Sequence, residues 1–167
     1  MSVKKLVYLS IYLALSVIFS YVESLIPLGI PGVKLGLANV IILILLVSDT
    51  ALDALVVLIL RICIVALIRG SILTPTFYMS LFGGLSAYLA MFIFTKIKLF
   101  SLYGISTLGS VCHTIGQIVT LGILLGTSNV TVYFPIIGLL SIITGVFSGF
   151  LAIKLLKRKD VILPFNE

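Results

Sequence analysis

This chain of 167 residues contains long apolar stretches that end in turns or in basic residues. These stretches limit the folds that the chain can adopt more than any other feature. Hydrophobic residues make up 61% of the chain and charged residues 10%, against about 45–50% and about 25% in soluble domains. Intrinsic disorder is excluded as well, because it requires low hydrophobicity and high charge. A transmembrane helix takes about 20 residues, so the chain has room for about six spans and their loops.

The apolar stretches predict an all-α integral membrane protein, a six-transmembrane-helix bundle that forms a single transmembrane domain over residues 1–167. Strands are excluded because the runs lack the alternation of a membrane barrel, and open strands leave backbone groups unsatisfied in lipid. The second helix is short for a span, so we expect it to be tilted or sheltered by its neighbours. The predicted helices cover residues 3–23, 34–47, 51–68, 75–95, 102–125 and 132–156.

Basic residues predict the orientation. With the N-terminus inside, the outer loops hold only Lys34 and Arg69. The cytoplasmic segments hold the set of basic residues given at the end of this paragraph. By the positive-inside rule we expect a multi-pass protein of the plasma membrane with both termini in the cytoplasm. The net charge of +6 therefore indicates membrane orientation, and we expect no nucleic acid partner. The cytoplasmic set is Lys4, Lys5, Lys96, Lys98, Lys154, Lys157, Arg158 and Lys159.

A polar stripe runs along the helix predicted for residues 102–125. Steps of three and four residues place five polar side chains on one face: Ser106, Ser110, His113, Gln117 and Thr120. Polar groups in hydrocarbon need partners, so this face should point into the bundle. It forms either the wall of a binding cavity or a polar seam between helices, and we favour the cavity because a histidine at span depth indicates a site.

A second polar group is expected near the outer ends of the first three helices: Glu23, Lys34, Asn39, Arg61 and Arg69. Three cations against one carboxylate favour an anionic ligand. Alternatively, Lys34 and Arg69 are solvated loop ends, and Arg61 pairs structurally with Glu23. The predicted substrate-binding residues are therefore Glu23, Lys34, Asn39, Arg61, Arg69, His113 and Gln117.

Aromatic side chains of the helix predicted for residues 75–95 give a different option for the ligand. Phe77, Tyr78 and Phe82 would stack on a ring, although apolar packing or lipid contact explains them better.

We find no catalytic constellation, and we expect no enzyme activity, cofactor or metal site. The sequence has no phosphate-binding P-loop, so the chain is not expected to hydrolyse ATP by itself. Asp49 and Asp53 are better explained as a helix cap with favourable N-terminal charge than as a magnesium site. Cys63 and Cys112 each lie inside an apolar run, where they act as small apolar residues.

Glycine pairs predict close helix contacts. Gly122 and Gly126 are four residues apart, as are Gly145 and Gly149. Such pairs let helix backbones approach one another in a membrane.

The segment Glu23–Pro27, continued by Pro31–Asn39, resembles the small membrane family called heptaprenyl diphosphate synthase component I or Gx transporter. That family is similar to the substrate-binding S components of energy-coupling factor (ECF) transporters, which are six-helix bundles. The resemblance implies that Pro31, Gly32, Lys34 and Asn39 lie over a ligand. It also implies partners: a transmembrane coupling subunit, which contacts small residues of the first helix, and cytoplasmic ATPases.

The first functional hypothesis is therefore an S component that captures a small anionic, vitamin-like or isoprenoid-related metabolite from outside. The alternative is a non-catalytic membrane accessory subunit that docks a prenyl (heptaprenyl) diphosphate synthase through its cytoplasmic face. A proton-coupled carrier using His113 and Glu23 is a third option, but the chain has few ionisable groups for it.

Overall fold

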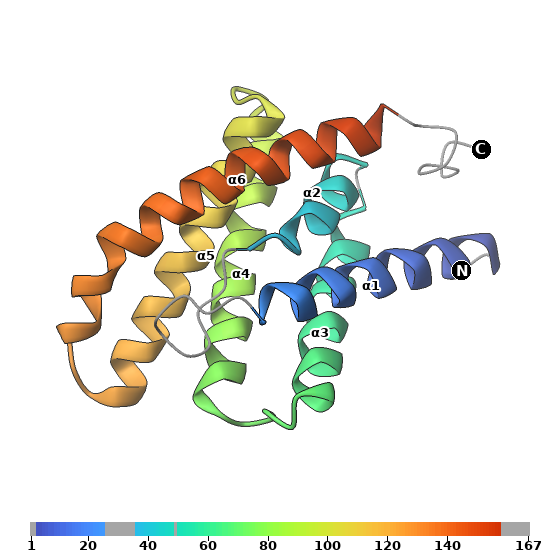
Figure 1. The fold of residues 1–167 in the computed structure, drawn as a ribbon. Helices are drawn as coiled ribbons and strands as arrows, with labels where there is room; N and C mark the ends of the chain where they lie inside the picture. The colour runs from blue at the N-terminus through green and yellow to red at the C-terminus, as the bar shows by residue number, and fades with distance from the viewer. Residues whose placement is uncertain (1–2, 26–35, 49, 158–167) are drawn as a thin grey trace.

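The computed structural model describes residues 3–25, 36–48 and 50–157. All regular structure in these segments is helical, which confirms the predicted all-α membrane bundle (Figure 1). A short 3-10 helix, η1, leads into the last α-helix. The elements are α1 Val3–Glu23, α2 Asn39–Val47, α3 Ala51–Ile68, α4 Pro75–Ile97, α5 Leu102–Leu125, η1 Asn129–Tyr133 and α6 Phe134–Leu156.

Five of the described helices are long and apolar enough to cross a membrane: α1, α3, α4, α5 and α6 together with η1. Their outward faces carry large apolar side chains, such as Ile18 of α1, Val119 of α5 and Ile143 of α6, all more than half exposed. A soluble protein rarely leaves so much apolar surface uncovered. The chain is therefore embedded in a lipid bilayer.

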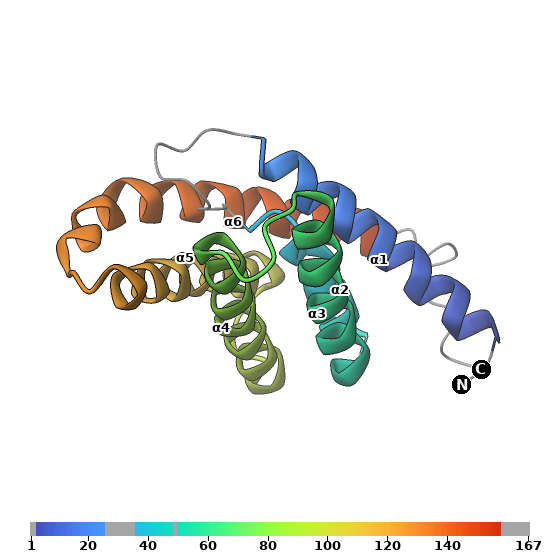
Figure 2. The same cartoon turned by 90° about the horizontal axis from the view of Figure 1, so that it is seen from below.

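The long helices run in crossing directions, and α5 packs against both α4 and α6. In Figure 1, α3 and α4 run side by side, and α1 and α6 lie across them. Figure 2 agrees, since α3 and α4 are foreshortened there while α1 and α6 appear along their length. An ion pair of 2.6 Å between Lys5 Nζ and Asp53 Oδ2 joins the first turns of α1 and α3. These two helix starts therefore lie on the same side, and the chain reverses direction between them.

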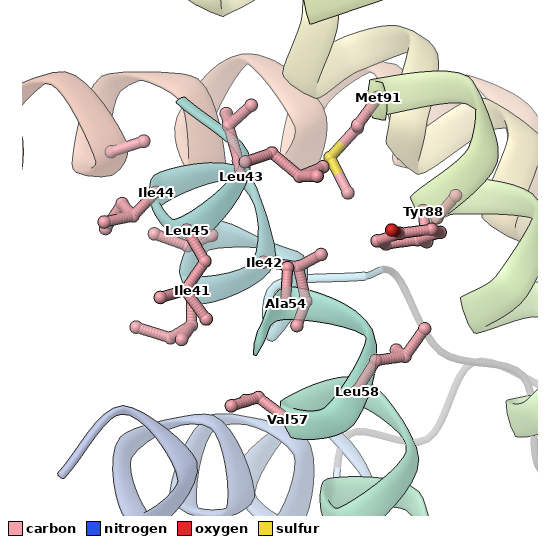
Figure 3. Close-up of a cluster of buried hydrophobic side chains, with 14 of the residues drawn as sticks. Ile41, Ile42, Leu43, Ile44, Leu45, Ala54, Val57, Leu58, Tyr88 and Met91 are labelled. Atoms are coloured by element: carbon pink, nitrogen blue, oxygen red, sulfur yellow. The ribbon is translucent and has the colours of Figure 1, made fainter. Parts of the chain in front are cut away.

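The short helix α2 is the centre of the bundle. It contacts all five other α-helices, and every residue from Asn39 to Leu46 is buried. Figure 3 shows its side chains pointing in several directions, with residues of α3 and α4 beside them. A helix that is apolar on all sides is stable only when it is enclosed. Nine residues span about 14 Å, so neighbours rather than lipid surround it, as its length led us to expect.

The start of α2 corrects our prediction. We expected a helix over residues 34–47, but residues 36–38 form a turn and α2 begins at Asn39. Gly36 has φ of +89°, which a right-handed helix does not contain. Residues 34 and 35 lie outside the described part of the chain.

Other helix limits agree within two residues. Helix α4 continues to Ile97 rather than residue 95 and is followed by Lys98, whose φ is +55°. Helix α6 begins at Phe134 rather than residue 132, because η1 takes up residues 129–133.

Glycines allow two close helix crossings. A Cβ atom on Gly145 or Gly149 of α6 would lie 2.6 Å and 2.9 Å from the Cα atoms of Thr107 and Tyr103 of α5. This confirms close packing at the predicted Gly145–Gly149 pair. The other predicted pair acts differently, because Gly126, with φ of +63°, is the C-cap of α5.

Candidate functional site

Glu23 joins the end of α1 to the turn that precedes α2. Its side chain is 2% exposed, and its Oε1 accepts hydrogen bonds from the backbone N–H groups of Gly36 and Leu37, at 3.1 Å for Leu37. Both N–H groups precede the first turn of a helix that starts at Asn39, where no intrahelical partner exists for them. The carboxylate therefore stabilises the turn that leads into α2.

Arg61 lies in the middle of α3 and is 3% exposed. Its Nη2 donates a long hydrogen bond of 3.5 Å to Oδ1 of Asn39, the first residue of α2. Within the described segments, Nε and Nη1 of Arg61 and Nδ2 of Asn39 are buried and have no hydrogen-bond partner.

The α5 stripe reaches the same place. Ser106, Ser110, His113, Gln117 and Thr120 are all buried, which confirms that the stripe faces the bundle interior. A Cβ atom on Gly36 would point at this stripe and would lie 3.6 Å from Ser110 Oγ and 3.8 Å from His113 Cγ. On the α4 side, a Cβ on Gly83 would lie 2.7 Å from Gln117 Cγ.

One part of the stripe packs between helices, and another part lines a cavity. Cβ positions on Gly145 and Gly149 of α6 lie 3.1 Å and 3.3 Å from the Cβ atoms of Ser110 and Ser106, so that end of the stripe packs between helices. His113 instead lines a cavity. The described stripe thus includes a packed seam and a residue that lines a small cavity, and its role in binding a ligand stays a prediction.

A small cavity lies among the polar side chains. The space open to the centre of a water molecule is about 10 Å³, which is room for about one water. Four of the predicted binding residues line it: Glu23, Asn39, Arg61 and His113. The remaining lining residues are Ser20, Gly36, Ala38, Ile62 and Ser80.

Of the other described binding residues predicted, Gln117 is buried in the α5 stripe without lining this cavity, and Arg69 lies away from it. Arg69 is the exposed C-cap residue of α3 and lines a separate small cavity with Ser71, Thr76 and Phe77. Lys34 lies outside the described residues. The described cluster holds the guanidinium of Arg61 and the carboxylate of Glu23, and the predicted excess of positive charge, which also counts Lys34, stays a prediction.

Sequence patterns did not reveal the roles of Ser80 and Gly36. Ser80 of α4 lines the cavity, but it stands among apolar neighbours, and its hydroxyl donates to Thr76 O at 2.8 Å. Gly36 was read only as part of a motif. Gly36 lies between the buried carboxylate of Glu23 and the buried amide of Asn39. This position is visible in the folded structure and not in the sequence.

The acidic residues near the start of α3 have structural roles where they are described. Asp53 lies in the first turn of α3, where a negative charge is favourable, and pairs with Lys5. Asp49 lies outside the described residues.

Together, the helices and the cluster define a membrane-embedded helical bundle with buried polar residues in its interior. The sequence matches the family model described as heptaprenyl diphosphate synthase component I over residues 12–155, and the chain belongs to that family. This confirms the family that the Glu23–Asn39 segment resembles, whereas the likeness to S components stays a prediction. A search of curated proteins and a search of solved structures returned no match.

Proposed function

We propose that this chain is a non-catalytic membrane subunit that captures a small molecule at the buried polar cluster. One observation carries the proposal: Glu23, Asn39, Arg61 and His113 come from four helices and line one cavity. Ionisable side chains at this depth are costly in a membrane protein and are kept mainly where they bind or conduct something.

The proposed topology places the cluster in the outer half of the membrane. With both termini in the cytoplasm, α1 ends and α2 begins on the outer side, and the cluster lies where these two helix ends meet α3. A molecule arriving from outside would reach it from the side of the membrane on which α1 ends and α2 begins.

The proposed partners follow from the resemblance to S components. Uptake against a gradient requires an energy source, and the sequence has no P-loop with which to hydrolyse ATP. A transmembrane coupling subunit and cytoplasmic ATPases would supply it. The single-domain organisation and the location in the plasma membrane belong to the same proposal.

The second candidate function is that of an accessory subunit, and the family description favours it. That description names a component of heptaprenyl diphosphate synthase. In this case the cytoplasmic ends of the helices would dock a soluble prenyl synthase. Asp53, Lys96, Lys98 and Lys157 would contribute, as would Asp49, Arg158 and Lys159, which lie outside the described residues.

A tagged purification from native membranes in mild detergent separates the two functions. Co-purifying proteins are identified by mass spectrometry, and small molecules are extracted from the same sample and identified. We expect a membrane coupling protein with ATPases, together with a bound small molecule that is lost in Arg61→Ala.

The matched variant is the double substitution Lys96→Ser with Lys98→Ser, which alters the proposed cytoplasmic face and leaves the cluster intact. We expect it to retain the small molecule. A prenyl synthase subunit that arrives without ATPases, persists in Arg61→Ala and is lost in the lysine variant would overturn capture and establish the accessory function.

A further inference from the structure

The cavity offers hydrogen-bond donors that nothing in the described chain uses. The Arg61 guanidinium has one N–H on Nε and two on Nη1, and the Asn39 amide has two on Nδ2. All three nitrogens are buried, and none has a partner among the described residues. Their side chains are 3% and 4% exposed, so bulk water does not satisfy them either. Buried polar atoms in native proteins are almost always hydrogen-bonded, so these donors indicate a missing acceptor.

Arg61 sets the orientation of Asn39. A guanidinium has no acceptor, so the Asn39 atom that faces Nη2 of Arg61 must be the carbonyl oxygen Oδ1. The amide nitrogen Nδ2 then points the other way, and a Cβ on Gly36 would lie 3.1 Å from it. Because residue 36 is glycine, the space beside this donor stays open.

A single water molecule is a poor acceptor for this set. The cavity admits about one water, and a water has two lone pairs with which to accept. The Glu23 carboxylate holds the backbone N–H groups of Gly36 and Leu37 in place. An oxyanion has two or three oxygens on one centre, and arginine binds carboxylates and phosphates through its planar array of N–H groups.

We infer that the site takes a terminal oxyanion of the captured molecule, a carboxylate or a phosphate, held by Arg61 and by the amide nitrogen of Asn39. This inference rests on the proposed capture function and names the chemical class that enters the site. Asn39 is the specificity-determining residue, because it adds donors without adding charge. Glu23 is a positioning residue that holds the turn at Gly36. Since an oxyanion is larger than the present cavity, its binding must displace part of the lining.

The test uses the full chain in lipid nanodiscs and two probes, sodium phosphate and sodium acetate, against sodium chloride at equal ionic strength. The readout is the midpoint temperature of thermal unfolding across a probe titration. The variants are Asn39→Asp, which replaces the amide donor by a carboxylate, Asn39→Ala, which removes it without charge, and Arg61→Met. Arg69→Met is the matched control, because it removes an arginine from the same helix away from the cavity.

We expect phosphate or acetate to raise the midpoint in the wild type and in Arg69→Met, and the more effective probe identifies the oxyanion. The apparent affinity should fall about tenfold or more in Asn39→Ala, and further in Asn39→Asp and Arg61→Met. Either Asn39 variant suffices if the other does not fold.

The inference is overturned if neither probe stabilises the wild type, or if stabilisation survives unchanged in the Asn39 and Arg61 variants. In that event, an uncharged molecule recovered by the extraction described above would leave the capture function standing. Recovery of no small molecule would remove both proposals together.

Discussion

At the residue scale, single side chains join parts of the chain that are distant in sequence. Glu23 accepts from backbone groups 13 and 14 residues further on, and Arg61 donates to Asn39, 22 residues before it. The bonds of Gly36 and Arg61 are buried and that of Leu37 is partly buried, so the loss of a partner leaves an unsatisfied group with little access to water. The polar cluster is therefore both the candidate site and a structural link between α1, α2 and α3.

Replacing Glu23 tests this link. Glu23→Ala removes the acceptor for the N–H groups of Gly36 and Leu37, and we expect a destabilisation of about 1–3 kcal/mol, typical of a buried group left unpaired. Hydrogen exchange of these two amides should accelerate. Both effects are measured on purified protein, by thermal unfolding and by mass spectrometry of exchanged peptides.

Glu23→Gln serves as the control, because it retains one acceptor oxygen of the same reach. Its destabilisation should be smaller than that of the alanine variant. Equal stability of Glu23→Ala and the wild type would show that the carboxylate does not hold the turn.

At the element scale, α2 explains why a short helix occurs at the centre of a membrane bundle. Ile41, Ile42, Leu43, Ile44 and Leu45 are all at most 1% exposed, and no polar face interrupts them. Since α2 contacts all five other α-helices, its packing helps to hold these helices together. The polar cluster begins at its first residue, so α2 also sets the position of Asn39.

Truncating α2 should therefore cost more than truncating a span that faces lipid. Ile42→Ala removes a fully buried side chain and leaves a cavity, with an expected loss of about 2–5 kcal/mol. Ile18→Ala on α1 is the matched control, because Ile18 is 55% exposed and lipid chains fill the space it leaves. The comparison is made by unfolding both variants under identical detergent conditions. A larger effect at Ile18 would contradict the central role of α2.

At the scale of the whole molecule, the ion pair between Lys5 and Asp53 shows which ends of α1 and α3 lie together. The starts of α1 and α3 lie on one side. The chain must therefore cross back between these two helices, although α2 alone is too short to cross a membrane. The path of the five long helices is then compatible with both termini on one side, as the distribution of basic residues predicts.

Site-directed labelling tests that orientation. With Cys63 and Cys112 replaced by serine, single cysteines are placed at Ser101 or Ser128, exposed residues just beyond opposite ends of α5. In intact cells, a membrane-impermeant maleimide should label Ser128→Cys at once and Ser101→Cys only after the membrane is permeabilised. Labelling in the opposite order would place both termini outside and remove the route by which the cluster receives an external molecule.

Much of the fold could be predicted from the sequence because its causes are local. The extents of α1, α3 and α5 follow from apolar runs and their flanking turn residues, and the α5 stripe follows from spacing along one helix. That these polar residues turn inward follows from the cost of exposing them to lipid. None of these conclusions requires knowledge of which helices are neighbours.

Part of the site could not be predicted, because it depends on distances between elements. A charge count grouped Arg69 with Arg61, but α3 carries one guanidinium out to its C-cap and the other into the core. Nothing in the sequence near Ser80 shows that it lines the same cavity as Arg61. The start of α2 also depended on a distant group, since Glu23 holds Gly36 and Leu37 in the turn before the helix.

The amino-acid sequence was enough to predict a membrane-embedded helical bundle, because the bilayer admits few structures for so apolar a chain. It also determined the family, which the motif from Glu23 to Asn39 indicates and the match over residues 12–155 shows. Which polar residues share a cavity, and which donors have no acceptor among the described residues, became visible in the folded chain alone. The physical reason is that these residues come from different helices, and the packing of the helices sets which of their side chains become neighbours.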